Sequence, residues 1–399
     1  MKSTTIAILL GVLLLFGCVN QAPPQQNSSV AVSAPGPGQS VVPTPYTNFS
    51  EPAPNTSANV PQPVIPPLPA NATLGRDPRF ATYDPGNGYV YVLNYQDDTV
   101  SVLNGTSVIA TLPVGSSPIS AAYDPSDGYV YVANEFGTKE PSANEFGNEP
   151  ESGTVSVLNG TSVIATVPVG NVPDSQIAYD PGDGYVYVPN DMDNTVSVIS
   201  GTSVIASVTA GTDAHAAVYD SGNGYVYVLD YDTVSVLNGT SVVATIPAES
   251  PVSAAYDPGN GYIYITNSDN TVSVINDTSF ISDFVVENNP GTPTYNPRDG
   301  YVYVASSLDE MVYLVNGTSV IANVTVGNDP VFSAYDPGDG YVYVTNYDDN
   351  TVSVLNGTTL IATDQVGNDP SFAAYDSGNK YMYVVNDIAD SNGTISVLN

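Results

Sequence analysis

Apolar and polar residues alternate with a period of two in short runs from about residue 70 to the C-terminus. A representative set of runs covers residues 119–123, 128–132, 154–158 and 162–167. Such alternation over a few residues is typical of strands, and we name these four predicted strands a to d in chain order. Turn residues separate the strands of each unit, for example Asp-Pro-Gly-Asn-Gly at 84–88 between a and b and Asn-Gly between c and d. No stretch shows helical spacing.

This four-strand unit repeats along the chain. The tyrosine that begins each Tyr-Asp or Tyr-Asn turn recurs at intervals of 40, 56, 40, 37, 39, 40 and 40 residues. These tyrosines are Tyr83, Tyr123, Tyr179, Tyr219, Tyr256, Tyr295, Tyr335 and Tyr375. A period near 40 residues with short strands is the mark of β-propeller blades.

The two ends of the repeat array complement each other. The last unit stops at Leu398-Asn399 without a strand d, whereas Ala70–Gly75 resembles a strand d that precedes the first complete unit. We therefore predict an all-β, eight-bladed β-propeller of four-stranded antiparallel blades, closed by an N-terminal outer strand in the last blade. Closure of this kind leaves no open sheet edge between the termini.

Side chains of strand b and strand c suit burial on both faces. Strand b places tyrosine on one face and valine on the other, while strand c opposes valine with serine or threonine. Stacked blades would bury the bulky tyrosines against small residues of the next blade. We assign the 29 tyrosines mainly to this packing, in preference to an aromatic platform for sugars.

The first residues read as an export signal. Lys2 is followed by an apolar run from Ile6 to Phe16, shorter than the about 20 residues that a membrane-spanning helix needs. The ending Leu15-Phe16-Gly17-Cys18 resembles the lipobox of prokaryotic lipoproteins, with a plain secretory signal as the alternative. We expect residues 1–17 to be a signal peptide and Cys18, the only cysteine, to carry the lipid.

Residues 18–68 are rich in Pro, Ser, Asn and Gln and form the expected lipid-anchored linker, followed by the propeller at 69–399. The chain has 6 basic and 40 acidic residues and a formal charge of -34. Nucleic-acid binding needs a basic face, so this balance argues against it. A secreted chain with one cysteine also has no internal disulfide to hold it together.

Three short strings carry a family resemblance. Tyr131-Val132-Ala133-Asn134, Tyr264-Ile265-Thr266-Asn267 and Tyr343-Val344-Thr345-Asn346 resemble the YVTN-type β-propeller repeat, and the resemblance covers all eight units. That family is similar to archaeal and bacterial surface-layer and secreted propellers. The resemblance implies extracellular display on a prokaryotic, archaeal-type cell surface, but the repeat encodes a fold and specifies no chemistry.

The turns between strands c and d match the N-glycosylation sequon in six units. The candidate acceptors are Asn104, Asn159, Asn238, Asn276, Asn316 and Asn356. Asn-Gly followed by a β-branched residue is also good hairpin chemistry, so the alternative is a purely structural turn. Glycans there would coat one face of the propeller and leave the other free.

Acidic residues gather in the loops between strands b and c, on the opposite face. They are Asp97, Asp98, Asp191, Asp193, Asp230, Asp232, Asp269, Asp309, Glu310, Asp348, Asp349, Asp387 and Asp390. Carboxylates could hold calcium, although no loop has the full ligand ladder of an EF-hand. Solvated turns of a highly charged protein are the alternative.

The second unit carries an insertion between strands b and c, in which Asn134-Glu-Phe-Gly137 recurs as Asn144-Glu-Phe-Gly147. Phe136 and Phe146 are therefore candidate partner contacts, unless the duplication has no function. The sole histidine, His215, begins strand a of the fourth unit and has no partner at a recognisable triad or metal spacing. We expect no catalytic residue, no cofactor and no metal.

These observations favour a non-enzymatic cell-surface lipoprotein scaffold for protein–protein interaction, adhesion or envelope and surface-layer assembly. Its expected partners are surface proteins or glycans, or further copies of the chain. The alternative is an extracellular module that binds polysaccharide or calcium.

Overall fold

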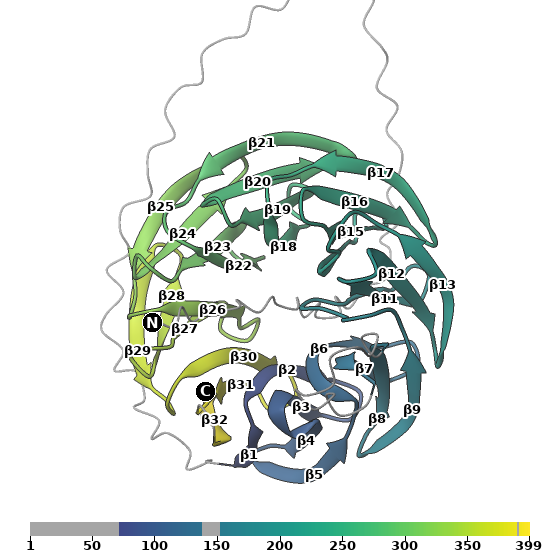
Figure 1. Ribbon diagram of the computed structural model, residues 1–399. Helices are drawn as coiled ribbons and strands as arrows, with labels where there is room; N and C mark the ends of the chain where they lie inside the picture. The colour runs from purple at the N-terminus through teal and green to yellow at the C-terminus, as the bar shows by residue number, and fades with distance from the viewer. Residues whose placement is uncertain (1–71, 138–151, 389–390) are drawn as a thin grey trace, which may run out of the picture. The chain divides into compact units, whose positions relative to one another are not determined.

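Alternating strands and tight turns produce eight separate sheets in the computed structural model, which describes residues 72–137, 152–388 and 391–399. Each sheet has four antiparallel strands, and the sheets follow one another around a ring (Figure 1). The only helical element in the described ranges is the 3-10 turn η1 (Tyr95–Asp97). The predicted eight-bladed β-propeller is therefore confirmed.

Strand a of each blade is the innermost strand of its sheet. These strands are β2 (Pro78–Asp84), β6 (Ser116–Asp124), β10 (Ala178–Asp180), β14 (Ala216–Asp220), β18 (Pro251–Asp257), β22 (Pro290–Asn296), β26 (Pro330–Tyr335) and β30 (Pro370–Asp376). Strand b follows in β3 (Tyr89–Asn94), β7 (Tyr129–Phe136), β11 (Tyr185–Asn190), β15 (Tyr225–Leu229), β19 (Tyr262–Asn267), β23 (Tyr301–Ser306), β27 (Val342–Asn346) and β31 (Tyr381–Asn386).

Strand c comprises β4 (Thr99–Asn104), β8 (Thr154–Asn159), β12 (Thr195–Ser200), β16 (Thr233–Asn238), β20 (Thr271–Asn276), β24 (Met311–Asn316), β28 (Thr351–Asn356) and β32 (Asn392–Leu398). The outer strand d comprises β5 (Ser107–Pro113), β9 (Ser162–Pro168), β13 (Ser203–Thr209), β17 (Ser241–Pro247), β21 (Ser279–Val285), β25 (Ser319–Thr325), β29 (Thr359–Gln365) and, in the last blade, β1 (Thr73–Arg76).

Strand β1 takes the outer position of the sheet β1-β32-β31-β30. It runs antiparallel to β32, with Thr73 opposite Thr394 and Arg76 opposite Asn392. The strand has 4 residues where β5 has 7. Residues 70 and 71 of the expected closing segment lie outside the described ranges, as do Cys18, the linker and Phe146.

The hydrophobic core lies between blades and not within any one of them. One cluster joins Tyr227 and Val236 of the fourth blade to Ile263 and Ile275 of the fifth. The strand-b tyrosines are the largest fully buried side chains, as predicted from their periodicity: Tyr91, Tyr131, Tyr187, Tyr227, Tyr264, Tyr303 and Tyr383. Each blade thus depends on its two neighbours for burial.

Candidate functional site

Two faces of the ring carry the polar residues. The a–b and c–d turns share one face, because the Tyr91 hydroxyl donates to the carbonyl oxygen of Gly160 in the next blade at 3.0 Å. We call this the turn face. The d–a links and b–c loops share the other, the loop face, where the backbone N–H of Tyr95 donates to Asp77 at 2.9 Å.

Tyrosine–aspartate hydrogen bonds join neighbouring blades on the turn face. In the pair between the last two blades, the Tyr375 hydroxyl meets Asp336, whose carboxyl also accepts from the Gly338 N–H at 2.6 Å. Burial, reinforced by the charge of Asp339, raises the pKa of Asp336 to about 6. Seven blade junctions carry this pair: Asp84–Tyr123, Asp124–Tyr179, Asp180–Tyr219, Asp220–Tyr256, Asp257–Tyr295, Asp336–Tyr375 and Asp376–Tyr83.

The eighth junction has Asn296 at the aspartate position. Its Oδ1 accepts from the Arg298 N–H at 2.9 Å, the same turn bond that Asp336 makes, while its Nδ2 donates to Gly340. Arg298 reaches across to the carbonyl oxygen of Asp339 in the next blade. The turn therefore tolerates a neutral side chain, and the repeated aspartates are structural.

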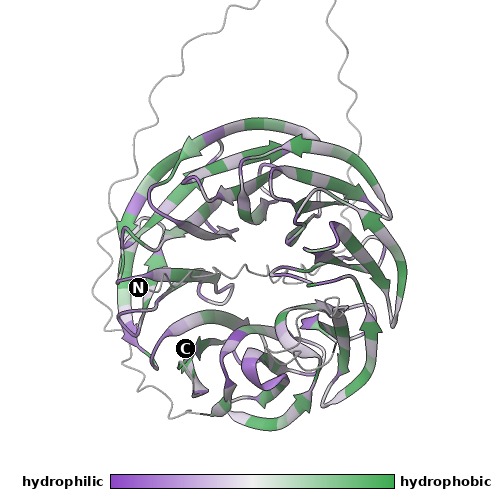
Figure 2. Cartoon of the chain, in the orientation of Figure 1, coloured by the Kyte–Doolittle hydropathy of each residue, from purple (hydrophilic) through white to green (hydrophobic). Residues whose placement is uncertain are grey.

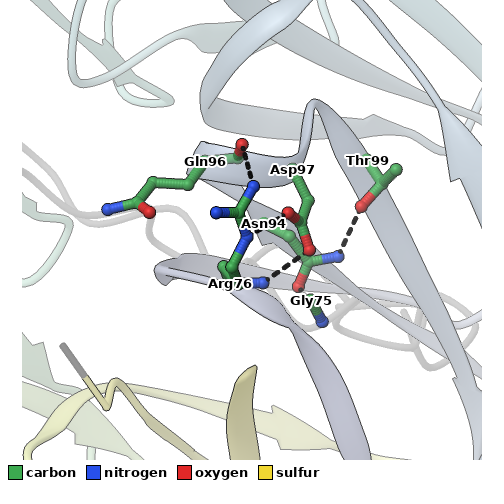
Figure 3. A network of polar contacts seen from close by, with 6 residues as sticks. All are labelled: Gly75, Arg76, Asn94, Gln96, Asp97 and Thr99. Atoms are coloured by element: carbon green, nitrogen blue, oxygen red, sulfur yellow. Dashed lines mark hydrogen bonds and ion pairs between the residues drawn. The ribbon is translucent and has the colours of Figure 1, made fainter. Parts of the chain in front are cut away.

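The asparagine that ends strand b is also structural, as Figure 3 shows for Asn94. Its Oδ1 accepts from the Gly75 N–H at 3.0 Å, and its Nδ2 donates to Thr99 at 3.0 Å and to Ser101 at 2.9 Å. The close approach leaves no room at residue 75, where a Cβ would lie 2.7 Å from the Asn94 side chain. The last residue of the YVTN-like string thus ties strands b and c to the incoming chain.

Carboxylates of the loop face are engaged by neighbouring chain segments. Asp97 accepts from Arg76 Nε at 2.6 Å and from the Arg76 N–H at 2.9 Å (Figure 3). Asp193 and Asp349 receive equivalent backbone bonds, each at 2.8 Å. In the described part of the chain, no three His, Cys, Asp or Glu side chains converge in a way that could hold a metal ion.

The loop face also holds an arginine cluster that the sequence reasoning missed. Arg79 donates from Nε and Nη2 to Asp77 at 2.8 and 2.7 Å, and its guanidinium lies 3.6 Å from the ring centre of Tyr95. The Tyr95 hydroxyl donates to Glu135 of the next blade at 2.8 Å. Burial raises the pKa of Asp387 to about 7, and the nearby charge of Asp77 adds to the rise. The carboxyl groups of Asp387 and Asp77 share a hydrogen bond.

That cluster links the last, first and second blades. The signal for it was present in the sequence, since Arg76 and Arg79 are the one close pair of cations near the start of the repeats. Their partners come from sequence positions far apart, so only the closed ring brings them together.

His215 is held by backbone on both sides. Its Nδ1 lies 2.9 Å from the carbonyl oxygen of Asp213, and its Nε2 lies 3.0 Å from that of Pro251 in the fifth blade. Carbonyl oxygens only accept, so both contacts are hydrogen bonds when both ring nitrogens carry protons. The half-buried ring bridges two strand-a starts, and each of its nitrogens lies within hydrogen-bonding distance of a backbone carbonyl oxygen.

The six sequon asparagines lie at the c–d turns of the turn face. Asn104, Asn159, Asn238, Asn316 and Asn356 are exposed, and Asn276 is half-buried. Gly105 shows why the turn is sharp, because its φ of 56° lies in the left-handed region. Their glycosylation stays a prediction. Phe136, at the end of β7, is half-buried.

A row of apolar side chains around the rim was not predicted. In β5, Val108 and Ala110 pair with Leu103 and Val102, so Ile109 between them is the extra residue of a β-bulge. The same residue is bulged and exposed in seven outer strands, from 40 % for Ile361 to 47 % for Val243. We call this set the rim belt: Ile109, Ile164, Ile205, Val243, Ile281, Ile321 and Ile361.

A groove lies on the rim where the fourth and fifth blades meet. Its volume is about 410 Å³, and its lining includes Phe280, Asp283, Asp269 and Glu249. Phe280 is 46 % exposed, at a position where β5 and β9 have valine. An exposed aromatic ring beside carboxylates is a surface on which polar ligands with an apolar face can rest.

Comparisons with known proteins support the fold alone. No protein-family model and no curated protein matches the chain. Among solved structures, dihydro-heme d1 dehydrogenase NirN aligns with a TM-score of 0.62 at 13% identity, over 80% of this chain and 71% of that one. Hydrazine synthase of Kuenenia stuttgartiensis aligns with a TM-score of 0.53 at 17% identity, over 84% and 98%.

A candidate 6-phosphogluconolactonase from Bacteroides uniformis aligns with a TM-score of 0.51 at 17% identity, over 75% of this chain and 97% of that one. At these identities the likeness extends to the propeller architecture and to no activity. In the ranges that the structure describes, no helix is long and apolar enough to cross a membrane.

Proposed function

We propose that this chain is a non-enzymatic cell-surface scaffold: a propeller of the YVTN type, tethered by a lipid on Cys18 through the 18–68 linker. It would act in protein–protein contact, adhesion or assembly of the cell envelope. The observation that carries the proposal is the rim belt, a repeated apolar surface on a chain of charge -34. Exposed apolar side chains that lie together mark interaction sites. In β13, β17, β21 and β29 the rim-belt residue directly follows a second exposed apolar residue.

The bonding pattern of the two faces supports a scaffold. Repeated polar groups such as Asp336, Asn94 and Asp97 bond to neighbouring strands or blades, and so they brace the ring. A braced ring presents its outer surface in a fixed arrangement, which lowers the entropy lost when a partner binds.

Location is tested on the native membrane. Mass spectrometry of the N-terminal peptide should find a lipid on Cys18, and Cys18→Ser should move the protein from the membrane fraction into the medium. Ser28→Ala, in the linker, is the matched control and should stay with the membrane. An unmodified Cys18 in membrane-bound protein would refute the tether.

A polysaccharide-binding module is the second candidate, favoured by the groove beside Phe280. On a glycan array, binding that Phe280→Ala abolishes and Ile281→Ala leaves intact would support it. Binding unaffected by both substitutions would remove the groove from consideration.

A further inference from the structure

The rim belt is a feature of the repeat and not of one blade. In the seven long outer strands, the bulged position is always isoleucine or valine. Two positions later the residue is also exposed but is threonine, serine, aspartate or asparagine. Figure 2 shows the resulting hydrophobic colouring along the outer strands. An exposed apolar residue at the bulged position is therefore a constant feature of the seven long outer strands.

The bulge determines what kind of contact the rim can make. Outer strands are sheet edges, and bulges are one of the devices that prevent an edge from accepting another strand. A bulge also re-aims the side chain of its extra residue. The rim is thus poorly suited to strand addition and well suited to side-chain contact through Ile109 and its equivalents.

Charge identifies the partner. The seven long outer strands contain only two charged residues, Asp283 and Asp364, although the chain has 40 acidic residues. A basic partner would be drawn to the acidic loop and turn faces, and an anionic membrane surface would be repelled. An uncharged apolar rim fits a second uncharged apolar rim, and contact there keeps the acidic faces of two rings apart.

We propose that copies of this chain associate rim to rim through the rim belt; this rests on the proposed scaffold function. Because the rim is convex, only a few outer strands of each ring touch at once. Such a contact is smaller than the roughly 1,200 Å² of a stable interface, so each one is weak. Tethering to a common membrane raises the effective concentration and lets several weak contacts act together. The last blade, whose outer strand is β1, interrupts the belt.

The test uses the full chain with Cys18→Ser, which separates self-association from lipid attachment. Sedimentation velocity over a concentration series should show reversible association that strengthens from low to high salt, because salt screens the repulsion and does not weaken apolar contact. Replacing all seven rim-belt residues with threonine should raise the dissociation constant at least tenfold.

The control variant changes the exposed first residue of six of these strands from serine to threonine, at Ser107, Ser162, Ser203, Ser241, Ser279 and Ser319. It should associate within about twofold of the parent. A parent chain that stays monomeric at high concentration and salt, or a sevenfold variant that associates like the parent, would overturn the proposal.

A second measurement covers the case in which the sevenfold variant fails to fold. Ile205→Cys in the Cys18→Ser background should form a disulfide-linked dimer under mild oxidation. Ser126→Cys, exposed on the turn face, should not. Equal cross-linking of the two variants would contradict rim contact. Failure here leaves the lipid result on Cys18 untouched, so the two proposals can fail separately.

Discussion

Acidification should stabilise this protein, and Asp336 shows why. Asp336 as a whole residue is 6 % exposed, and burial raises the pKa of its carboxyl group from 3.8 to about 6 even though Gly338 and Tyr375 donate hydrogen bonds to it. Between those two values the folded chain holds a proton that the unfolded chain releases. The contribution of Asp336 to stability is therefore present below about pH 4 and is lost as the pH rises through about 6.

The substitution Asp336→Asn removes the free-energy cost of burying a charged carboxylate at neutral pH. A displacement from 3.8 to about 6 corresponds to about 3 kcal/mol at 1.36 kcal/mol per pKa unit. We halve this figure, because the adjacent turn residues Pro337 and Gly338 are exposed and solvent there partly screens the charge, which leaves about 1.5 kcal/mol at pH 7. For a folded domain of roughly 300 residues, that gain raises the melting temperature by about 2 °C. Asn296 shows that the turn accepts an amide.

Scanning calorimetry at pH 7 and pH 4.5 checks the sign. Asp336→Asn should melt higher than the parent at pH 7 and by a smaller margin at pH 4.5, because much of the difference disappears as the pH falls from about 6 toward 4. Asp97→Asn is the control. Burial alone would raise the pKa of Asp97, but the hydrogen bonds and the charge of Arg76 outweigh burial and hold that pKa below its usual value. That variant should melt lower than the parent at pH 7. A lower melting temperature of Asp336→Asn at pH 7 would refute the reasoning.

Three further perturbations test the bracing of the ring. Deleting residues 70–75 removes all of β1 but Arg76 and should lower the melting temperature clearly and broaden the calorimetric transition; an unchanged curve would count against closure by this strand. Tyr256→Phe removes the hydroxyl that bonds to Asp220 and should destabilise the chain by about 1 kcal/mol in urea unfolding, with no change expected if solvent replaces the bond. Gly115→Ala places a Cβ 2.8 Å from the Asn134 side chain and should lower the yield of folded protein, whereas equal yield would mean that the d–a link can move.

The eight-bladed architecture followed from the sequence because it depends on local patterns. Period-two alternation and Asn-Gly or Asp-Gly turns fix each strand and hairpin, and the repeat near 40 residues fixes the number of sheets. The burial of Tyr131 and its equivalents followed from the same periodicity.

The sequence could not predict the pairing register of the outer strands or which residues of different blades contact one another. Ile109 falls on the pattern of an ordinary strand, and only its pairing with strand c reveals the bulge that exposes it. Arg79, Asp387 and Glu135 come from three different blades, so their cluster depends on ring geometry. The loop acids looked like free ligands, but Asp97 and Asp193 already hold neighbouring chain segments.

Because every apolar cluster lies at a junction between blades, the clusters also determine how the ring resists partial unfolding. The blade that contains Tyr227 cannot detach without exposing buried apolar side chains of both neighbouring blades to water. Because the sheets form a closed ring, each blade has a neighbour on both sides, and there is no terminal blade at which unfolding could begin. Detaching one blade would have to break two junctions at once, which makes such partial unfolding rare and leaves proteases little exposed backbone to cut.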